Sequence, residues 1–144
     1  MNKAICISGS VGTGKTTYAK KLAKKLGYTY VDVKKLFRAH HLDSVWDDER
    51  RCAIIDVSAL RKILVSLIKK NEHLVIDSHL SHYLAPQHVE KVIICKTTLR
   101  KLKNRLLKRR YSQKKIRENL DAEIFDVSLV EAQETGHTIE VVWT

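Results

Sequence analysis

The chain has 144 residues and a mass of 16.6 kDa, which is the usual length of a single domain with one hydrophobic core. With 44% hydrophobic and 30% charged residues it can bury such a core, so a disordered chain, a collagen-like repeat and a disulfide scaffold are excluded as the main architecture. The 27 lysines and arginines outnumber the 16 acidic residues, and the formal net charge is +11.

In chain order, strands are expected at residues 4–8, 28–31, 74–77, 89–95 and 138–143. Helices are expected from the glycine cluster to Leu26 and at 33–41, 54–70, 98–109 and 114–135, the last with an apolar stripe of Ile116, Leu120, Ile124, Val127 and Val130. Gly27 and Gly136 are expected to end two of these helices in the left-handed conformation. Strands that alternate with helices predict an α/β fold in which a parallel sheet is covered on both faces and the ligand lies at the carboxyl ends of the strands.

The glycines cluster after the first expected strand, in the run Gly9-Ser10-Val11-Gly12-Thr13-Gly14-Lys15-Thr16. This run matches G-x-x-x-x-G-K-[ST] at every fixed position, and a strand precedes it while a helix follows. Such a P-loop turns successive backbone N–H groups toward one phosphate, with the helix N-terminus adding partial positive charge. We expect Lys15 to reach the β- and γ-phosphates and Thr16 to bind Mg²⁺. A plain turn between strand and helix needs neither side chain.

A second motif ends the strand 74–77 with a carboxylate, Asp77. On the strand beside a P-loop this pattern is typical of a Walker-B acid that organises Mg²⁺ and its water, although an aspartate here also suits a helix N-cap. His79, two residues later, is a candidate for orienting a water or accepting a proton; a surface histidine is the other interpretation.

The positive excess is concentrated in one segment, which we call the basic segment. Residues 96–117 hold eleven basic residues and no acidic one, so this segment alone accounts for the net charge. A solvated helix face is one interpretation, but like charges repel and no glutamate is interleaved with them. The concentration predicts a polyanionic partner, either the phosphates of a nucleotide or the backbone of RNA.

The three cysteines, Cys6, Cys52 and Cys95, form no C-x-x-C pair and no zinc-like cluster. Cys6 and Cys95 lie in apolar runs and are expected to be small buried hydrophobes. No apolar run approaches the roughly 18 residues of a membrane span, so we expect no membrane contact. The expected location is the cytoplasm, or the nucleus in a eukaryote.

Taken together, the chain resembles the adenylate kinase isoenzyme six family, small P-loop proteins of archaea and eukaryotes, also described as coilin-interacting nuclear ATPases and linked to small ribosomal subunit maturation. The resemblance covers residues 1 to about 135. It rests on 9–17, Tyr30-Val31-Asp32-Val33, Leu36, Arg38, Val75-Ile76-Asp77-Ser78-His79, Arg105-Leu106, Arg109, Tyr111, Lys114-Lys115-Ile116, Glu118-Asn119-Leu120 and Ala122-Glu123-Ile124-Phe125.

The resemblance implies a P-loop, nucleoside monophosphate kinase-like domain over residues 1–144, with a five-stranded parallel sheet, a monophosphate-binding insertion at 32–55 and a lid at about 106–117. It implies a platform protein of the small ribosomal subunit as partner. It also implies site residues: Gly12, Thr13, Gly14, Lys15, Thr16, Thr17 and Arg109 for ATP, Arg38 for AMP, Thr16 and Asp77 for Mg²⁺, and Lys15, Asp77, His79 and Arg109 for catalysis.

The chain departs from the family at three places. Val11 stands where a proline is usual, and Arg110 stands where the lid normally has a glycine hinge, so loop rigidity and lid motion are expected to differ. Family members also continue into a C-terminal helix, whereas this sequence stops at Thr144. Either the helix is absent or the sequence is a shortened one, and one face of the sheet is then expected to be less covered.

The leading functional hypothesis is Mg²⁺-dependent transfer of the ATP γ-phosphoryl group to AMP, and more slowly to water. One alternative is an ATP-switched ribosome assembly factor that binds a ribosomal protein or rRNA through the basic segment, with kinase activity incidental. Another is a small-metabolite kinase on the same scaffold, which would differ mainly in residues 32–55.

Overall fold

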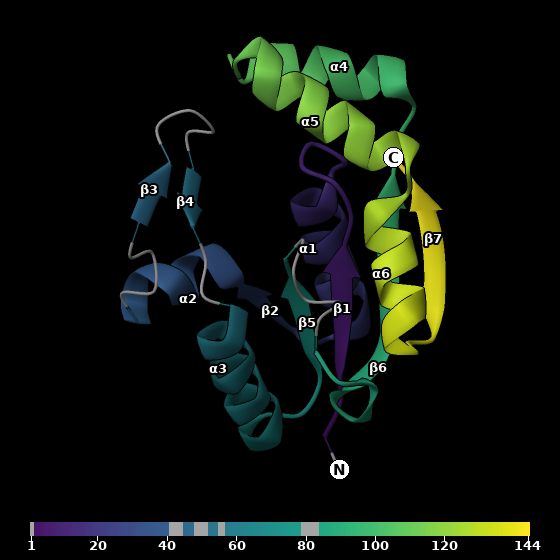
Figure 1. Cartoon of the computed structure of the whole chain (residues 1–144). Coiled ribbons are helices and arrows are strands. Elements are labelled where there is room, and N and C mark those ends of the chain that lie inside the picture. Colours follow the sequence, from purple (N-terminus) through teal and green to yellow (C-terminus); the bar gives the residue numbers. More distant parts are fainter. Residues whose placement is uncertain (1, 41–44, 48–51, 55–56, 79–83) are drawn as a thin grey trace.

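The computed structural model describes residues 2–40, 45–47, 52–54, 57–78 and 84–144. Its centre is a five-stranded sheet in the order β2 (Thr29–Asp32), β5 (Leu74–Asp77), β1 (Ala4–Ser8), β6 (Val89–Lys96) and β7 (Ile139–Trp143) (Figure 1). Every neighbouring pair is parallel. The predicted α/β fold with a five-stranded parallel sheet is therefore confirmed, and the carboxyl ends of all five strands meet at one edge.

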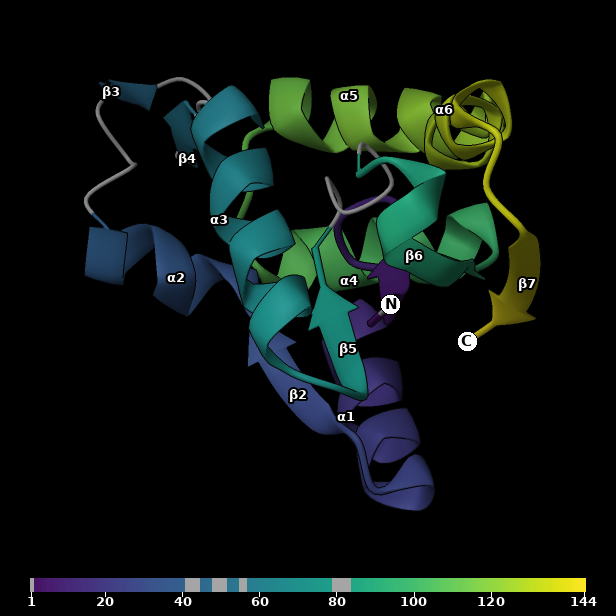
Figure 2. The ribbon, with the colours of Figure 1, turned by 90° about the horizontal axis from the view of Figure 1, so that it is seen from below.

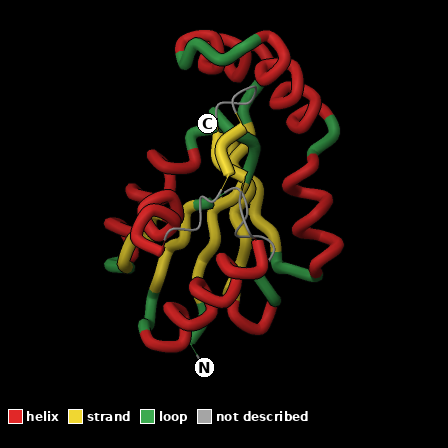
Figure 3. The backbone as a smooth tube through the Cα atoms, turned by 60° about the vertical axis from the view of Figure 1, so that its left-hand side comes forward, coloured by secondary structure: helices red, strands yellow, loops and turns green. Residues whose placement is uncertain are grey.

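The helices are α1 (Lys15–Leu26), α2 (Val33–His40), α3 (Val57–Lys70), α4 (Leu99–Lys108), α5 (Gln113–Ile124) and α6 (Val127–Thr135), with a short 3-10 turn, η2 (Pro86–His88). Figure 2 shows α1 on one face of the sheet and α3 and α6 on the other, and Figure 3 shows the strands enclosed between these helices. Among the described helices none is both long and apolar enough to cross a membrane.

The central strand β1 supplies both halves of the core because its side chains alternate between the two faces of the sheet. Ala4 and Cys6 pack in the cluster that includes α3 and α6, while Ile5 and Ile7 pack in the cluster that includes α1. Cys6 and Cys95 are buried, as expected. A strand buried on both faces fixes the starting point of the P-loop at the middle of the sheet edge.

Helices α4 and α5 form a third, smaller cluster built on Leu102, Leu106 and Ile116. Val11, at the tip of the P-loop, packs against this cluster. The residue that replaces the usual proline thus contributes apolar contact between the loop and α4. Figure 1 shows α4 and α5 lying over the carboxyl end of β1.

The expected single helix at 114–135 is wrong. Asp126 takes a left-handed conformation (φ 51°), and its carboxylate forms an ion pair with Lys96 at the end of β6. This break separates α5, which packs on α4, from α6, which lies on the sheet. The predicted apolar stripe is also wrong: Ile124, Val127 and Val130 are exposed, while Leu129 and Ala132 pack in the core.

The helix expected from Ile54 begins later, at Val57, and Ile54 instead ends a strand. The antiparallel hairpin of β3 (Val45–Asp47) and β4 (Cys52–Ile54) was not predicted. The other boundaries agree within one residue, and Gly27 and Gly136 end α1 and α6 with φ of 72° and 87°, as predicted.

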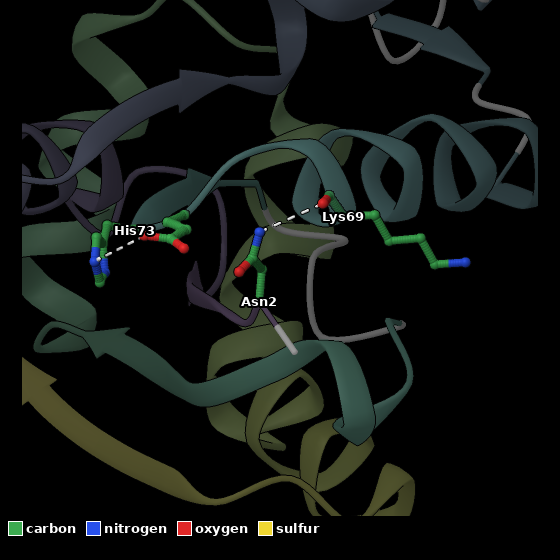
Figure 4. A network of polar contacts seen from close by, with 4 residues as sticks. Asn2, Lys69 and His73 are labelled. Carbon is green, nitrogen blue, oxygen red and sulfur yellow. Dashed lines mark hydrogen bonds and ion pairs between the residues drawn. The ribbon is translucent and has the colours of Figure 1, made fainter.

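At the amino ends of the strands, neighbouring segments make contacts that no sequence motif indicates. The Asn2 side chain donates a hydrogen bond to the Lys69 carbonyl (3.4 Å), and His73 forms an ion pair with Glu72 (3.8 Å), as Figure 4 shows. The backbone carbonyl of His73 accepts from the Thr29 amide at 2.9 Å. The hydrogen bond between Thr29 and His73 lies where the pairing of β2 with β5 begins.

Candidate active site

The P-loop runs from the end of β1 to the start of α1 and depends on three left-handed glycines. Gly9, Gly12 and Gly14 have φ of 139°, 88° and 82°. A Cβ on Gly9 would lie 2.5 Å from the carbonyl oxygen of Cys95, and one on Gly12 would lie 3.0 Å from the Leu102 side chain. Only glycine satisfies both the backbone angles and the space at these positions.

Lys15 points back over the loop. Its Nζ donates a hydrogen bond to the Ser10 carbonyl at 3.0 Å. Burial lowers the pKa of Lys15 to about 8; Asp77 raises the pKa, and the cations Lys34 and Arg109 lower it further. Three cationic side chains from α1, α2 and the end of α4 therefore act on one point beside a helix N-terminus, which is an arrangement suited to a polyanion.

Asp77 lies at the end of β5 and is only 9% exposed. One of its oxygens, Oδ2, accepts two hydrogen bonds, from the Thr16 hydroxyl at 2.8 Å and from the Tyr30 hydroxyl at 2.7 Å. The two predicted metal-binding residues are thus in direct contact. Tyr30 was not predicted as a site residue. It lies in the run Tyr30-Val31-Asp32-Val33, on which the family resemblance rests, but no local sequence pattern indicates its contact with Asp77, 47 residues away.

Two further residues hold the P-loop from outside and were not predicted. The Arg105 guanidinium donates to the Gly12 carbonyl at 3.0 Å and to the Thr144 hydroxyl at 3.2 Å. The Thr144 hydroxyl in turn donates to the Thr13 carbonyl at 2.7 Å. The carbonyls of Gly12 and Thr13 are therefore tied to the side chains of Arg105 on α4 and of Thr144 after β7.

A small cavity borders the loop on the side of α5 and α6, lined in part by Gly9, Ser10, Glu123 and Asp126. Glu123 is buried, and its Oε2 has no hydrogen-bond partner. Burial raises the pKa of Glu123, while Lys96 nearby lowers it. The carboxyl group lies next to the phosphate-binding loop.

The remaining predicted residues are placed as follows. Thr13 is fully buried, and its hydroxyl donates to the Ser10 carbonyl at 2.7 Å, so its side chain supports the loop. Thr17 is exposed in the first turn of α1. Arg109 is exposed at the end of α4, and Arg38 is exposed on α2. His79 lies outside the described residues.

The donor set at the sheet edge fits Mg²⁺. This ion takes oxygen ligands, and it is usually held by one or two protein groups together with waters and substrate phosphates. Thr16 and Asp77 place a hydroxyl and a carboxylate 2.8 Å apart beside the loop, which is a sparse oxygen set of that kind. In the part of the chain that the structure describes, no three His, Cys, Asp or Glu side chains form a denser metal cluster.

Comparison with known proteins agrees with this geometry. The model of the family described as "AAA domain" matches residues 5–126. A putative adenylate kinase of Methanosarcina barkeri is 39% identical over 132 residues, which cover 90% of this chain and 70% of that protein. The adenylate kinase isoenzyme 6 homolog of Caenorhabditis elegans is 33% identical over 132 residues, which cover 91% of this chain and 72% of that protein. This chain belongs to the adenylate kinase isoenzyme 6 family.

The fold of this isoenzyme 6 family member is shared with solved kinases of low sequence identity. Shikimate kinase from Acinetobacter baumannii superimposes with a TM-score of 0.65 at 15% identity, covering 97% of this chain and 83% of that one. A gluconokinase from Sinorhizobium meliloti gives a TM-score of 0.62 at 15% identity, covering 98% and 82%. At these identities the likeness concerns the fold alone.

Proposed function

We propose that this protein transfers the γ-phosphoryl group of ATP to AMP, and more slowly to water. The observation that carries the proposal is the P-loop with Lys15 above it and the Thr16–Asp77 contact beside it. The names of its relatives, putative adenylate kinases, support AMP as the acceptor. Residues 32–55, with Arg38, would form the monophosphate-binding insertion, and residues 106–117 the lid.

The proposed chemistry consists mainly of positioning and charge neutralisation. The loop N–H groups would bind the phosphate oxygens together with Lys15. Arg109 would approach the transferring group from the lid, where it already influences Lys15. Thr16 and Asp77 would hold Mg²⁺, which when bound neutralises charge on the phosphate oxygens. His79 as a base for hydrolysis stays a prediction, tested by ATP hydrolysis in His79→Ala.

The test separates the two acceptors by their products. With AMP as acceptor each turnover yields two ADP and no inorganic phosphate, whereas water as acceptor yields one ADP and one phosphate. We expect AMP to increase ADP formation without increasing phosphate release. Lys15→Ala should reduce both reactions at least about 100-fold, and Arg38→Ala should raise the KM for AMP while phosphate release stays unchanged. ADP formation that does not respond to AMP would exclude the kinase proposal.

A second candidate is the ATP-switched ribosome assembly factor, and the distribution of charge in the folded chain favours it. Lys96, Arg105 and Lys115 are used inside the molecule, in the ion pair with Asp126, against the P-loop and over the Tyr111 ring. The other basic side chains of the segment are exposed: Arg100, Lys101, Lys103, Lys108, Arg109, Arg110, Lys114 and Arg117. A switch requires that RNA or ribosomal-protein affinity differs between the ATP- and ADP-bound states.

A further inference from the structure

The structure gives one residue of the site an assignment that the motifs do not. Tyr30 lies on β2, and β2 pairs in parallel with β5, so that Asp32 is opposite Asp77 and Tyr30 is opposite Val75. From this position the Tyr30 hydroxyl donates to Asp77 Oδ2 at 2.7 Å. The same oxygen accepts from the Thr16 hydroxyl at 2.8 Å. One carboxylate oxygen therefore joins three elements, β2, β5 and α1.

The two hydroxyl groups have different tasks at this carboxylate. When Thr16 donates its proton to Asp77, the lone pairs of its oxygen are left for another partner. Tyr30 holds Asp77 from the side of β2, so that the carboxylate keeps the orientation in which it accepts from Thr16. Burial, followed by the hydrogen bond to Asp77, raises the pKa of Tyr30, so the phenol stays a neutral donor.

The ring of Tyr30 is held independently of its hydroxyl. It packs against the core cluster under α1, and the Lys20 Nζ lies 5.7 Å from the ring centroid. Removing the hydroxyl alone therefore leaves the ring in place and takes one of two donors from Asp77. We expect this loss to weaken Mg²⁺ binding by Thr16 and Asp77, because groups that hydrogen-bond to metal ligands orient those ligands and so affect the affinity for the metal.

We propose that Tyr30 is a positioning residue for the Mg²⁺-bound nucleotide, acting through Asp77 on the Thr16 hydroxyl. The inference rests on the proposed function, since it presupposes that this chain binds Mg²⁺ with ATP. It assigns a part of the Mg²⁺ dependence to a residue of β2 that lies outside both the P-loop and the Walker-B strand. Tyr30 itself touches neither nucleotide nor metal in this scheme.

Calorimetric titration with ATP, in Mg²⁺ and separately in EDTA, tests the proposal without measuring turnover. We expect Tyr30→Phe to weaken ATP binding about tenfold in Mg²⁺, because a hydrogen bond to a charged group is lost. In EDTA the affinity should equal that of the wild type, which also shows that the variant is folded. Tyr28→Phe is the matched control: it removes a hydroxyl from the same core cluster, one residue before β2 begins, and should change neither affinity.

The outcomes are separable. If Tyr30→Phe gains as much affinity from Mg²⁺ as the wild type does, the positioning role is wrong while the proposed function stands. An equal loss in Mg²⁺ and in EDTA would also overturn it, since Tyr30 would then act through packing alone. If the wild type itself gains nothing from Mg²⁺, the proposed function fails and this inference fails with it.

Discussion

At the scale of single residues, Lys15 shows how the site is prepared for an anion. Its ammonium group is buried, donates to the Ser10 carbonyl, and experiences the negative charge of Asp77 and the positive charges of Lys34 and Arg109. Its pKa of about 8 follows from this balance, in which burial is the largest cause. A bound triphosphate adds negative charge at short range, and an opposite charge raises the pKa of a lysine.

We therefore predict that ATP binding at pH 8 is accompanied by uptake of about half a proton on Lys15, since its pKa is about 8 in the free protein. The uptake is measured by calorimetry in two buffers of different ionisation enthalpy, and it should disappear at about pH 6, where Lys15 is already charged. Because the charged form binds phosphate, ATP affinity should fall as the pH rises through about 8.

Lys15→Arg is the control, because an arginine stays charged over this range and has no proton to take up. A buffer-dependent heat that persists unchanged in Lys15→Arg would assign the proton to another group. The same shift affects stability. Between pH 8 and 10.5 the unfolded chain holds more protons at Lys15 than the folded chain does, so the contribution of Lys15 to the free energy of unfolding rises with pH there.

The site residues divide into those with a local sequence pattern and those without one. The P-loop could be predicted because its glycines, Lys15 and Thr16 are adjacent in sequence, and Asp77 because it ends an apolar strand. Arg105 and Thr144 contact loop carbonyls that lie 93 and 131 residues away. Only the folded chain brings such pairs together, so sequence periodicity has no means of revealing them.

At the scale of elements, the turn between α4 and α5 shows the consequence of replacing the family's glycine. Arg110 adopts φ 57°, a left-handed conformation that costs an L-residue roughly 1–2 kcal/mol and costs glycine very little. The turn therefore keeps the backbone shape of a glycine hinge with a residue that does not favour it. The expected change in lid motion stays a prediction.

Arg110→Gly is predicted to raise the free energy of unfolding by about 1 kcal/mol, because it relieves the left-handed strain and loses only part of that gain to the greater entropy of the unfolded chain. Urea denaturation measures this as a higher midpoint at unchanged slope. Arg110→Ala is the control: it removes the same charge but keeps a Cβ in the left-handed region, so it should not stabilise. Equal stabilisation by both variants would attribute the gain to relief of charge repulsion.

Other element boundaries show where periodicity stops being informative. The hairpin of β3 and β4 falls in a polar stretch with three-residue strands, which are too short for an alternating pattern to be recognised. The break between α5 and α6 depends on Asp126, whose ion pair with Lys96 is a tertiary contact. By contrast, β1, β5 and β6 were predicted because each contains a compact apolar run, which the middle of the sheet buries.

At the scale of the whole molecule, the basic segment and the candidate active site lie at the same end. The carboxyl edge of the sheet carries the P-loop and Asp77, and α4 and α5, which hold most of the basic segment, lie over that edge (Figure 1). The opposite end carries the start of β1 and the last turn of α3. We therefore expect a polyanion longer than ATP to bind at the end that carries the P-loop, and its affinity to depend on residues of the proposed lid.

We predict that the chain binds a mixed-sequence single-stranded RNA through the exposed face of α4, with an affinity that falls steeply as salt increases, because each lysine–phosphate contact releases a counterion. Lys101→Ala with Lys108→Ala should reduce the slope of log K against log salt by about 1 to 2, as expected for two lost contacts. The matched pair is Lys69→Ala with Lys70→Ala, which removes the same charge from the exposed end of α3, far from α4. If both pairs lower the slope equally, RNA responds only to the net charge of +11, and the basic segment is not a docking surface.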